Sequence, residues 1–175
     1  MTSTKSATRR ARCTATLLEL AQLAHAQWFF GNVYEAVVRL PERLAYSVDG
    51  GIDQRPASVL GPGSPVRYYV PAAPVGVAST LGALITSRGD ARARRWLAIS
   101  TGCWVSGAAV TAYLVRRVNI KLFFAVDPAA PPPPVDREAL LHIWYRLNVL
   151  RIAAAGGALL AAYRAKRAAL EIFNT

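Results

Sequence analysis

Two uninterrupted apolar runs occupy the middle of the chain. No charged residue occurs between Tyr68 and Ser87 or between Trp96 and Val115. Each run is about 20 residues long, which is the length that a helix needs to cross the hydrocarbon core of a bilayer. The pattern therefore predicts two membrane-spanning helices, at about 68–87 and 96–117.

Two longer segments, near the two ends of the chain, mix apolar residues with polar ones at helical spacing. The first, 14–40, is apolar on both sides of its polar positions and ends before Pro41, which cannot continue a helix. The second, 138–163, finishes in a stretch that is free of charge and rich in Ala and Gly. We expect both to be helices of the same bundle, with their polar side chains facing its interior.

These four segments predict an all-α fold, namely a four-transmembrane-helix antiparallel bundle that occupies residues 14–165. A disordered basic tail, residues 1–13, is expected before it because nothing periodic appears there. A C-terminal tail, residues 166–175, is expected after it. The chain is short enough for one domain.

Gly and Pro residues mark the connections and irregularities of this bundle. The segment 41–67 is predicted to be a loop, because Gly and Pro punctuate it and no apolar period survives. Pro131–Pro134 predict a stiff polyproline spacer before the last helix. Pro74 predicts a kink in the second helix, and Gly102 with Ser106 predicts close helix contact in the third.

Composition and charge give the bundle a direction. Hydrophobic residues make up 53% of the 175 residues, yet the net charge is +11. The basic residues concentrate in the tail 1–13, the turn 88–95 and the C-terminal tail. The connections 41–67 and 116–141 carry most of the acidic residues. The positive-inside rule therefore places both termini in the cytoplasm, in a multi-pass protein of the cell membrane. Arg116 and Arg117 are the exception, at the external end of the third helix.

The same charge distribution excludes one function class. A nucleic-acid-binding domain places Lys and Arg along one face, with aromatic residues between them, and no such face occurs here. The basic residues lie beside the apolar runs instead, as membrane-flanking residues do. We therefore expect the lipid bilayer as a partner, and no nucleic acid.

The N-terminal segment also has the outline of a secretory signal peptide. Its basic start leads to an apolar stretch and then to Ala-His-Ala at 24–26, which resembles a cleavage site. Glu19 and Gln22 interrupt the apolar stretch, however, and the apolar character continues past the site. An uncleaved membrane helix is the better interpretation.

Motifs for metals, cofactors and hydrolysis are absent from the sequence. Cys13 and Cys103 lack CxxC spacing and have no His companions at metal-ligand spacing, so we expect two free thiols. No nucleotide-binding loop, GxSxG motif or Ser-His-Asp order occurs. We therefore predict no metal site and no cofactor.

The candidate chemistry lies on one stripe of each terminal helix. The six candidate residues recur at helical spacing, and they are His25, Asn32, Glu35, Trp144, Asn148 and Arg151. Because the first helix runs outward and the last runs inward, Asn32 and Glu35 share the outer half of the bilayer with Asn148 and Arg151. We expect a polar pocket between these two helices that binds a small aromatic or lipophilic ligand.

The partner of Glu35 decides between several interpretations. An ionisable group inside a membrane costs about 3 kcal/mol or more and therefore pairs. Arg151 is the first candidate partner and Arg146 the second. Two structural alternatives stay open: an i,i+4 pair with Arg39, and an architectural ion pair that fixes helix register. His25 lies deeper, and a core histidine bonded to a neighbouring helix is favoured over a proton acceptor.

These motifs resemble a known family of small four-helix membrane proteins, the anthrone-oxygenase-like family, long labelled a domain of unknown function. The resemblance covers the first and last helices and rests on Phe-Phe-Gly-x-x-Tyr-Glu at 29–35 before Pro41, Asn119-x-x-Leu122, and Trp144-x-x-x-Asn148-x-x-Arg151. It implies, for a subset of members, oxidation of anthrone-type polyketides to anthraquinones by dioxygen without metal or flavin. Asn148 and Arg151 would then be site residues, the guanidinium stabilising an anionic phenolate or enolate.

Two function classes follow from this sequence. The first is a multi-pass membrane protein with a ligand pocket between its first and last helices, in its narrowest form a cofactor-free oxygenase. The second is a non-enzymatic membrane scaffold or assembly component whose buried polar residues are structural. Proton-coupled transport is weaker than both, because no inverted repeat or pair of broken helices appears.

Overall fold

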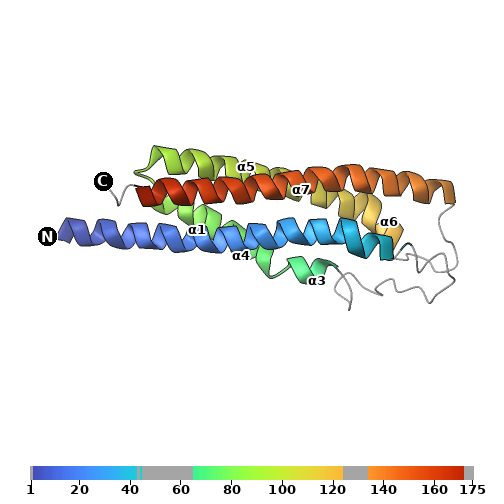
Figure 1. The fold of residues 1–175 in the computed structure, drawn as a ribbon, viewed down its shortest axis with the longest axis horizontal. Helices are drawn as coiled ribbons and strands as arrows, with labels where there is room; N and C mark the ends of the chain where they lie inside the picture. The colour runs from blue at the N-terminus through green and yellow to red at the C-terminus, as the bar shows by residue number, and fades with distance from the viewer. Residues whose placement is uncertain (1, 43, 45–64, 124–133, 172–175) are drawn as a thin grey trace.

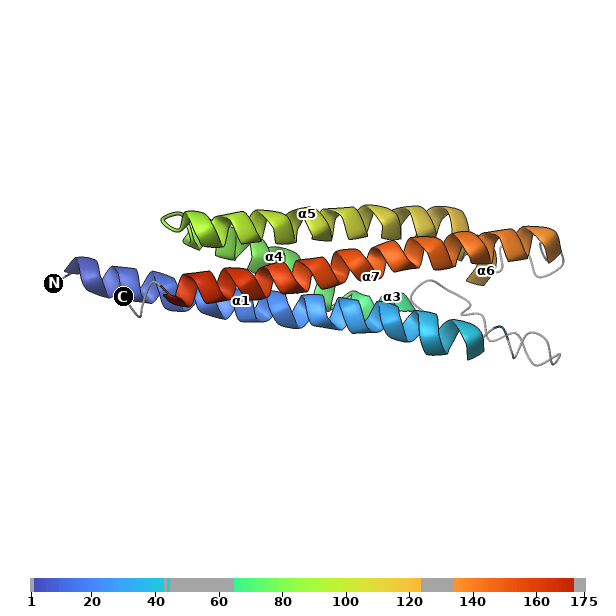
Figure 2. The same cartoon turned by 45° about the horizontal axis from the view of Figure 1, so that its top comes forward.

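The fold is all-α in a computed structural model that describes residues 2–42, 44, 65–123 and 134–171. Every regular element in these ranges is a helix, which confirms the all-α part of the predicted fold class. The helices form long rods that lie side by side along one axis, and the start of the first rod and the end of the last lie at the same end of the bundle (Figures 1 and 2).

Two π-helical turns extend the rods, which otherwise consist of α-helices. In chain order the elements are α1 (Thr2–Tyr34), the π-turn η1 (Glu35–Arg39), α3 (Pro65–Tyr69), α4 (Ala72–Thr86), α5 (Ala91–Leu114), the π-turn η2 (Val115–Asn119), α6 (Ile120–Phe123) and α7 (Pro134–Glu171). α1 packs against both α4 and α7, while α5 packs mainly against α7. The two helices that carry the candidate residues, α1 and α7, are therefore neighbours.

The bundle interior has an apolar cluster towards each end and a polar layer between them. The cluster nearest the chain ends consists of Leu18, Ala83, Leu97 and Ala165. The cluster at the opposite end consists of Leu40, Leu114, Val118 and Trp144. Buried polar side chains lie between the two clusters, and they include His25, Asn32, Ser100, Asn148 and Arg151.

Both expected tails are helical where the structure describes them, so the first and last helices extend beyond their predicted bounds. The predicted disordered tail 1–13 belongs to α1, which begins at Thr2. The predicted C-terminal tail 166–175 is helical as far as Glu171. Both segments contain several Arg, Lys and Ala residues, which have high helix propensity, and no Gly or Pro stops the helix there. Charge density marks where an apolar span ends, but it does not end a helix.

The helix expected at 96–117 begins earlier, inside the predicted basic turn 88–95. α5 starts at Ala91, because the Asp90 side chain caps it by accepting a hydrogen bond from the Ala93 amide at 3.0 Å. The last helix, expected at 138–163, also begins earlier. Of the predicted polyproline spacer, only Pro134 lies in the described residues, and it is the first residue of α7, where proline is well tolerated.

The second rod, expected at 68–87, breaks between α3 and α4 rather than kinking at Pro74. Pro74 has no N–H to donate to the Val70 carbonyl, and its ring crowds that carbonyl, so the chain turns at Val70 and Pro71. The Gln27 amide on α1 donates to the Tyr68 carbonyl at 2.9 Å, which satisfies one acceptor that the break exposes. Most of the predicted loop 41–67 lies outside the described residues.

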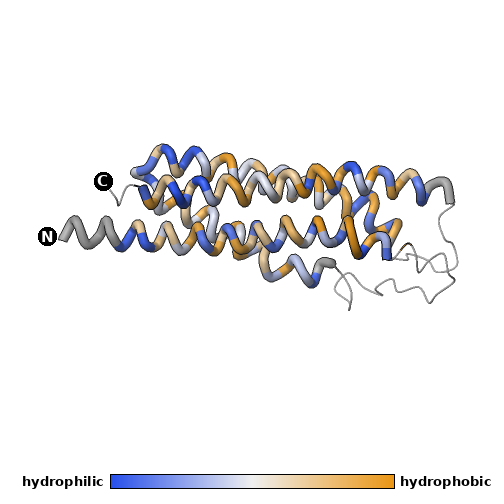
Figure 3. Tube along the Cα trace, in the orientation of Figure 1, coloured by the Kyte–Doolittle hydropathy of each residue, from blue (hydrophilic) through white to orange (hydrophobic). Residues whose placement is uncertain are grey.

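Within the described ranges, two helical runs are long and apolar enough to cross a membrane. They are Arg67–Thr86 and Ala91–Leu122, and they correspond to the two uninterrupted apolar runs of the sequence. α1 and α7 do not meet the same hydropathy test. Figure 3 shows many hydrophilic residues at the end that holds the end of α7 and the start of α5, and a more apolar middle.

Gly107, rather than Gly102, is where α5 comes closest to its neighbours. A methyl group on Gly107 would lie 2.9 Å from the Trp28 ring and 3.2 Å from the Ala154 Cβ, whereas one on Gly102 would meet nothing within 4 Å. The predicted contact at Gly102 and Ser106 was therefore placed on the wrong face, and Ser106 is exposed.

We expect Gly107→Ala to lower the free energy of unfolding by about 1–3 kcal/mol, because the added methyl overpacks the contact with Trp28 and Ala154. Gly102→Ala is the matched control and should be neutral or stabilising by up to about 1 kcal/mol, since alanine favours the helix. Thermal unfolding of both variants in detergent measures the difference. Equal effects in the two variants would contradict this packing.

Candidate functional site

A group of polar side chains from four helical elements, α1, η1, α3 and α7, meets between the first and last rods. We call it the Asn32 cluster, and it consists of Asn32, Glu35, Tyr69, Asn148 and Arg151. Asn32 and Glu35 are one turn apart on the α1 rod, and Asn148 and Arg151 are one turn apart on α7. Asn32 is completely buried, and only 3% of Arg151 is exposed. Four of the six residues predicted to form the site are therefore together.

Asn32 is the centre of the cluster. Its side-chain oxygen accepts a hydrogen bond from the Arg151 guanidinium, with 2.6 Å between Nη2 and Oδ1. The same oxygen accepts a bond from the Tyr69 hydroxyl at 3.3 Å. The Asn148 amide donates to the Asn32 backbone carbonyl at 3.2 Å. A hydrogen bond to a guanidinium is short and strong, so this contact fixes the depth of α7 against α1.

Glu35 supplies the negative charge of the cluster. Its Oε2 lies 3.9 Å from Arg151 Nη1, and both side chains are largely buried. The predicted pairing of Glu35 with Arg151 is confirmed. The alternative partner, Arg146, is exposed to the outside of α7. Arg39 pairs with Glu42 at 3.6 Å on the bundle surface.

Tyr69 was not predicted from the sequence. It belongs to the short helix α3, which the break at Val70 and Pro71 tilts away from α4. Gly31 lets α3 approach α1: a methyl group there would lie 2.7 Å from the Tyr68 ring and 2.9 Å from the Tyr69 ring. Gly31, next to Asn32, was a sign of close helix approach at this level. Which side chains approach it depends on the direction of α3 after the proline break, and the sequence does not give that direction.

Three polar atoms of the cluster have no hydrogen-bond partner within the described part of the chain. They are Asn32 Nδ2, Asn148 Oδ1 and Arg151 Nε, and all three are buried. Two are donors and one is an acceptor. Leaving such a group unpaired costs about 1–3 kcal/mol, and more for a charged group. The cluster therefore presents unused hydrogen-bonding capacity beside a buried cation.

His25 lies apart from the Asn32 cluster. It is about two turns further along α1, roughly 10 Å at 1.5 Å per residue. Its Nε2 lies 3.4 Å from both the Thr80 and the Ser100 hydroxyls, and Ser100 also donates to the Ala158 carbonyl at 2.9 Å. These contacts join α1 to α4 and α5, and they confirm the interpretation of His25 as a core histidine bonded to neighbouring helices. Its predicted place in the pocket was wrong.

Trp144 also lies outside the cluster, although it was predicted to line the same pocket. It is completely buried, and it packs in the apolar cluster with Leu40, Leu114 and Val118. Its indole Nε1 has no partner among the described residues. Trp144 precedes Asn148 by one turn on α7, so its side chain closes the end of the polar layer rather than lining it.

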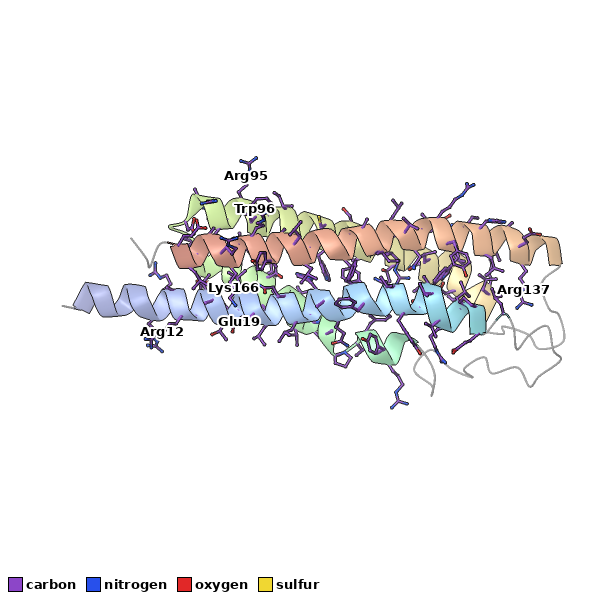
Figure 4. All side chains as sticks on the ribbon, in the orientation of Figure 1. Arg12, Glu19, Arg95, Trp96, Arg137 and Lys166 are labelled. Atoms are coloured by element: carbon purple, nitrogen blue, oxygen red, sulfur yellow. The ribbon has the colours of Figure 1, made fainter. Side chains whose placement is uncertain are left out.

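A charged pair joins α1 to α7 near the other end of the bundle. Glu19 pairs with Lys166 of α7 at 2.7 Å, and the two side chains point towards each other between α1 and α7 (Figure 4).

The described residues contain no group of three or more His, Cys, Asp or Glu side chains that could hold a metal ion. Cys13 is exposed and Cys103 is half-buried, and both are free thiols.

Comparison with known proteins returns no match: no family model, no curated protein and no solved structure matches this chain.

Proposed function

We propose that this protein is a multi-pass membrane protein whose Asn32 cluster binds a small aromatic or lipophilic ligand. In this proposal all four rods cross the cell membrane as an antiparallel bundle, and both termini face the cytoplasm. The observation that carries the ligand site is the set of three buried, unpartnered polar atoms beside the Arg151 guanidinium.

The distribution of polar and apolar side chains supports the membrane placement of α1 and α7. Their polar residues face inward: Asn32 and Asn148 are buried. Their apolar residues face outward: Phe30 is 62% exposed and Val149 is 63% exposed. In water this arrangement would bury polar side chains that need hydration and expose apolar side chains that avoid it. In a bilayer it is the stable arrangement, and hydropathy averages over α1 and α7 are low because they count the inward-facing polar residues.

The charge distribution supports the orientation. Arginine and lysine side chains gather at the end of the bundle where α1 starts and α7 ends, and Figure 4 labels Arg12, Arg95 and Lys166 there. The positive-inside rule assigns that end to the cytoplasm. The Asn32 cluster then lies in the outer half of the membrane.

The chemistry of the cluster favours a ligand with an acidic hydroxyl or an enolisable carbonyl. A guanidinium in a low-dielectric site stabilises a phenolate or enolate strongly, and Asn32 Nδ2 supplies a second donor. This is the part of the site that an anthrone oxygenase would require, because the substrate anion passes an electron to dioxygen. The narrower proposal is therefore oxidation of an anthrone by dioxygen without a cofactor, in which one oxygen atom becomes the new carbonyl of the anthraquinone and the other leaves as water with the two hydrogen atoms lost from the anthrone.

We expect the two faces of the membrane to label differently with a membrane-impermeant maleimide. Arg67→Cys, in a background where Cys13 and Cys103 are serine, should react in intact cells, because Arg67 is exposed in the middle of α3, which this proposal places on the external side. Cys13, in a Cys103→Ser background, should react only after lysis. Reaction of Cys13 in intact cells would reverse the orientation. Release of the protein from membranes by alkaline carbonate would reject the membrane placement.

Anthrone is the probe for the ligand site. It should raise the thermal stability of the purified protein by about 2.7 kcal/mol when its concentration is one hundred times its Kd. Arg151→Gln should abolish this shift, and Arg146→Gln, an exposed arginine on the same helix, should retain it. Oxygen consumption together with the shift identifies an oxygenase, and a shift without it identifies a binding protein. An unchanged shift in Arg151→Gln would reject the site.

A second candidate function is a non-enzymatic scaffold or assembly component. The contacts of Asn32 with Arg151 at 2.6 Å and with Asn148 at 3.2 Å favour it, because they join two helices directly. In that case the cluster fixes helix register and binds nothing. A stable stoichiometric partner complex, with no effect of anthrone, would support this alternative.

A further inference from the structure

A small hollow opens between the start of α5 and the end of α7, far from the Asn32 cluster. We call it the arginine hollow. It has a volume of about 110 Å³, and its lining residues are Arg92, Trp96, Arg164, Arg167, Ala168 and Glu171. Arg92 and Trp96 are one turn apart on α5, and Arg164, Arg167 and Glu171 lie on successive turns of α7.

We propose that the arginine hollow binds the phosphate of an anionic phospholipid headgroup from the cytoplasmic leaflet. The proposal rests on the membrane placement described above, which puts this end of the bundle in the cytoplasm. Three guanidinium groups and one carboxylate line the hollow, so it carries an excess of positive charge. Guanidinium is the side-chain group best matched to phosphate oxygens, because its planar fork donates two bonds at once.

Trp96 makes the hollow a lipid site rather than a general phosphate site. It is half-buried and packs against the apolar cluster of Leu18, Leu97 and Ala165. It also begins the uncharged run of α5, which is the position where an amphipathic indole meets the boundary between headgroups and acyl chains. One wall of the hollow is therefore cationic and the other is aromatic, as a glycerophosphate with attached acyl chains requires.

Glu171 competes with the lipid phosphate for one of these cations. It forms an ion pair with Arg92, with 2.7 Å between Oε2 and Nη1. Both side chains are at least half exposed, so the pair is weak and screened by salt. Arg164 and Arg167 are exposed and have no ion-pair partner among the described residues. These two residues are the principal phosphate ligands in this proposal.

The test compares two double variants that remove the same charge from the same end of the bundle. Arg164→Gln with Arg167→Gln changes the hollow. Arg94→Gln with Arg95→Gln changes exposed arginines outside the lining, and Figure 4 shows Arg95 pointing away from the bundle. Native mass spectrometry of each protein in detergent, with equal amounts of phosphatidylglycerol and phosphatidylcholine, measures which lipid is retained.

The wild type and the control pair should prefer phosphatidylglycerol, and the hollow pair should lose that preference roughly tenfold. Glu171→Gln should strengthen retention, because the competing carboxylate is gone. If both double variants lose the preference for phosphatidylglycerol equally, general surface charge causes the preference and the proposal is overturned. Displacement of the lipid by millimolar inorganic phosphate would assign the hollow to a soluble anion instead, which also overturns it. Carbonate extraction of the same membranes tests the membrane placement separately. A protein that stays in the membrane but fails the lipid test rejects the hollow alone.

Discussion

Glu35→Gln should lower the free energy of unfolding by about 3–5 kcal/mol, because it leaves the Arg151 guanidinium buried without its carboxylate. Only 4% of the Arg151 side chain is exposed, and Glu35 is the carboxylate that lies 3.9 Å from it. Arg151→Gln should cost much less. It removes a buried cation together with its desolvation penalty, and 12% of the Glu35 side chain still reaches the surface. Unfolding in mixed micelles measures both variants.

The double variant Glu35→Gln with Arg151→Gln is the control for this asymmetry. Its stability should lie close to that of Arg151→Gln alone. Without the Arg151 guanidinium, Glu35→Gln no longer leaves an unpaired buried charge. This pattern indicates that Arg151 is held in place at a cost to folding, as a working site requires. If Arg151→Gln alone also costs 3–5 kcal/mol and the double variant recovers most of it, the pair is architectural. If the stability loss of the double variant equals the sum of the two single losses, Glu35 and Arg151 are not energetically coupled.

The Asn32 cluster could be predicted in large part because helical spacing and depth are properties of the sequence. Asn32 and Glu35 share a stripe, Asn148 and Arg151 share another, and antiparallel crossing brings them to one level. The expected cost of an ionisable group in a membrane then favoured the pairing of Glu35 with Arg151, and the structure shows this pair at 3.9 Å.

His25, Trp144 and Tyr69 could not be placed by the same reasoning. Spacing gives the face of a helix, but it does not say which neighbour that face contacts. His25 faces hydroxyl groups on α4 and α5, and Trp144 faces an apolar cluster. Tyr69 depends on the direction that α3 takes after the proline break, which is a tertiary property. The predicted helix ends were wrong for a related reason: a basic segment ends an apolar run but remains helical.

Trp144 offers a separate test of how the polar layer is closed. Its indole is completely buried, and it fills the space between Leu40, Leu114 and Val118. Trp144→Ala removes the contacts and leaves a cavity, so we expect the free energy of unfolding to fall by about 3–5 kcal/mol. The cavity would lie one turn from Asn148, and it would open the polar layer at that end.

Trp144→Phe separates packing from hydrogen bonding at this position. Phenylalanine keeps most of the apolar volume and deletes the indole N–H, which has no partner among the described residues. We therefore expect a loss of less than about 1.5 kcal/mol. The ligand-induced stabilisation by anthrone should survive in Trp144→Phe, since Trp144 does not line the Asn32 cluster. If Trp144→Phe is as unstable as Trp144→Ala, or if it abolishes the anthrone shift, the indole N–H has a partner and Trp144 belongs to the site.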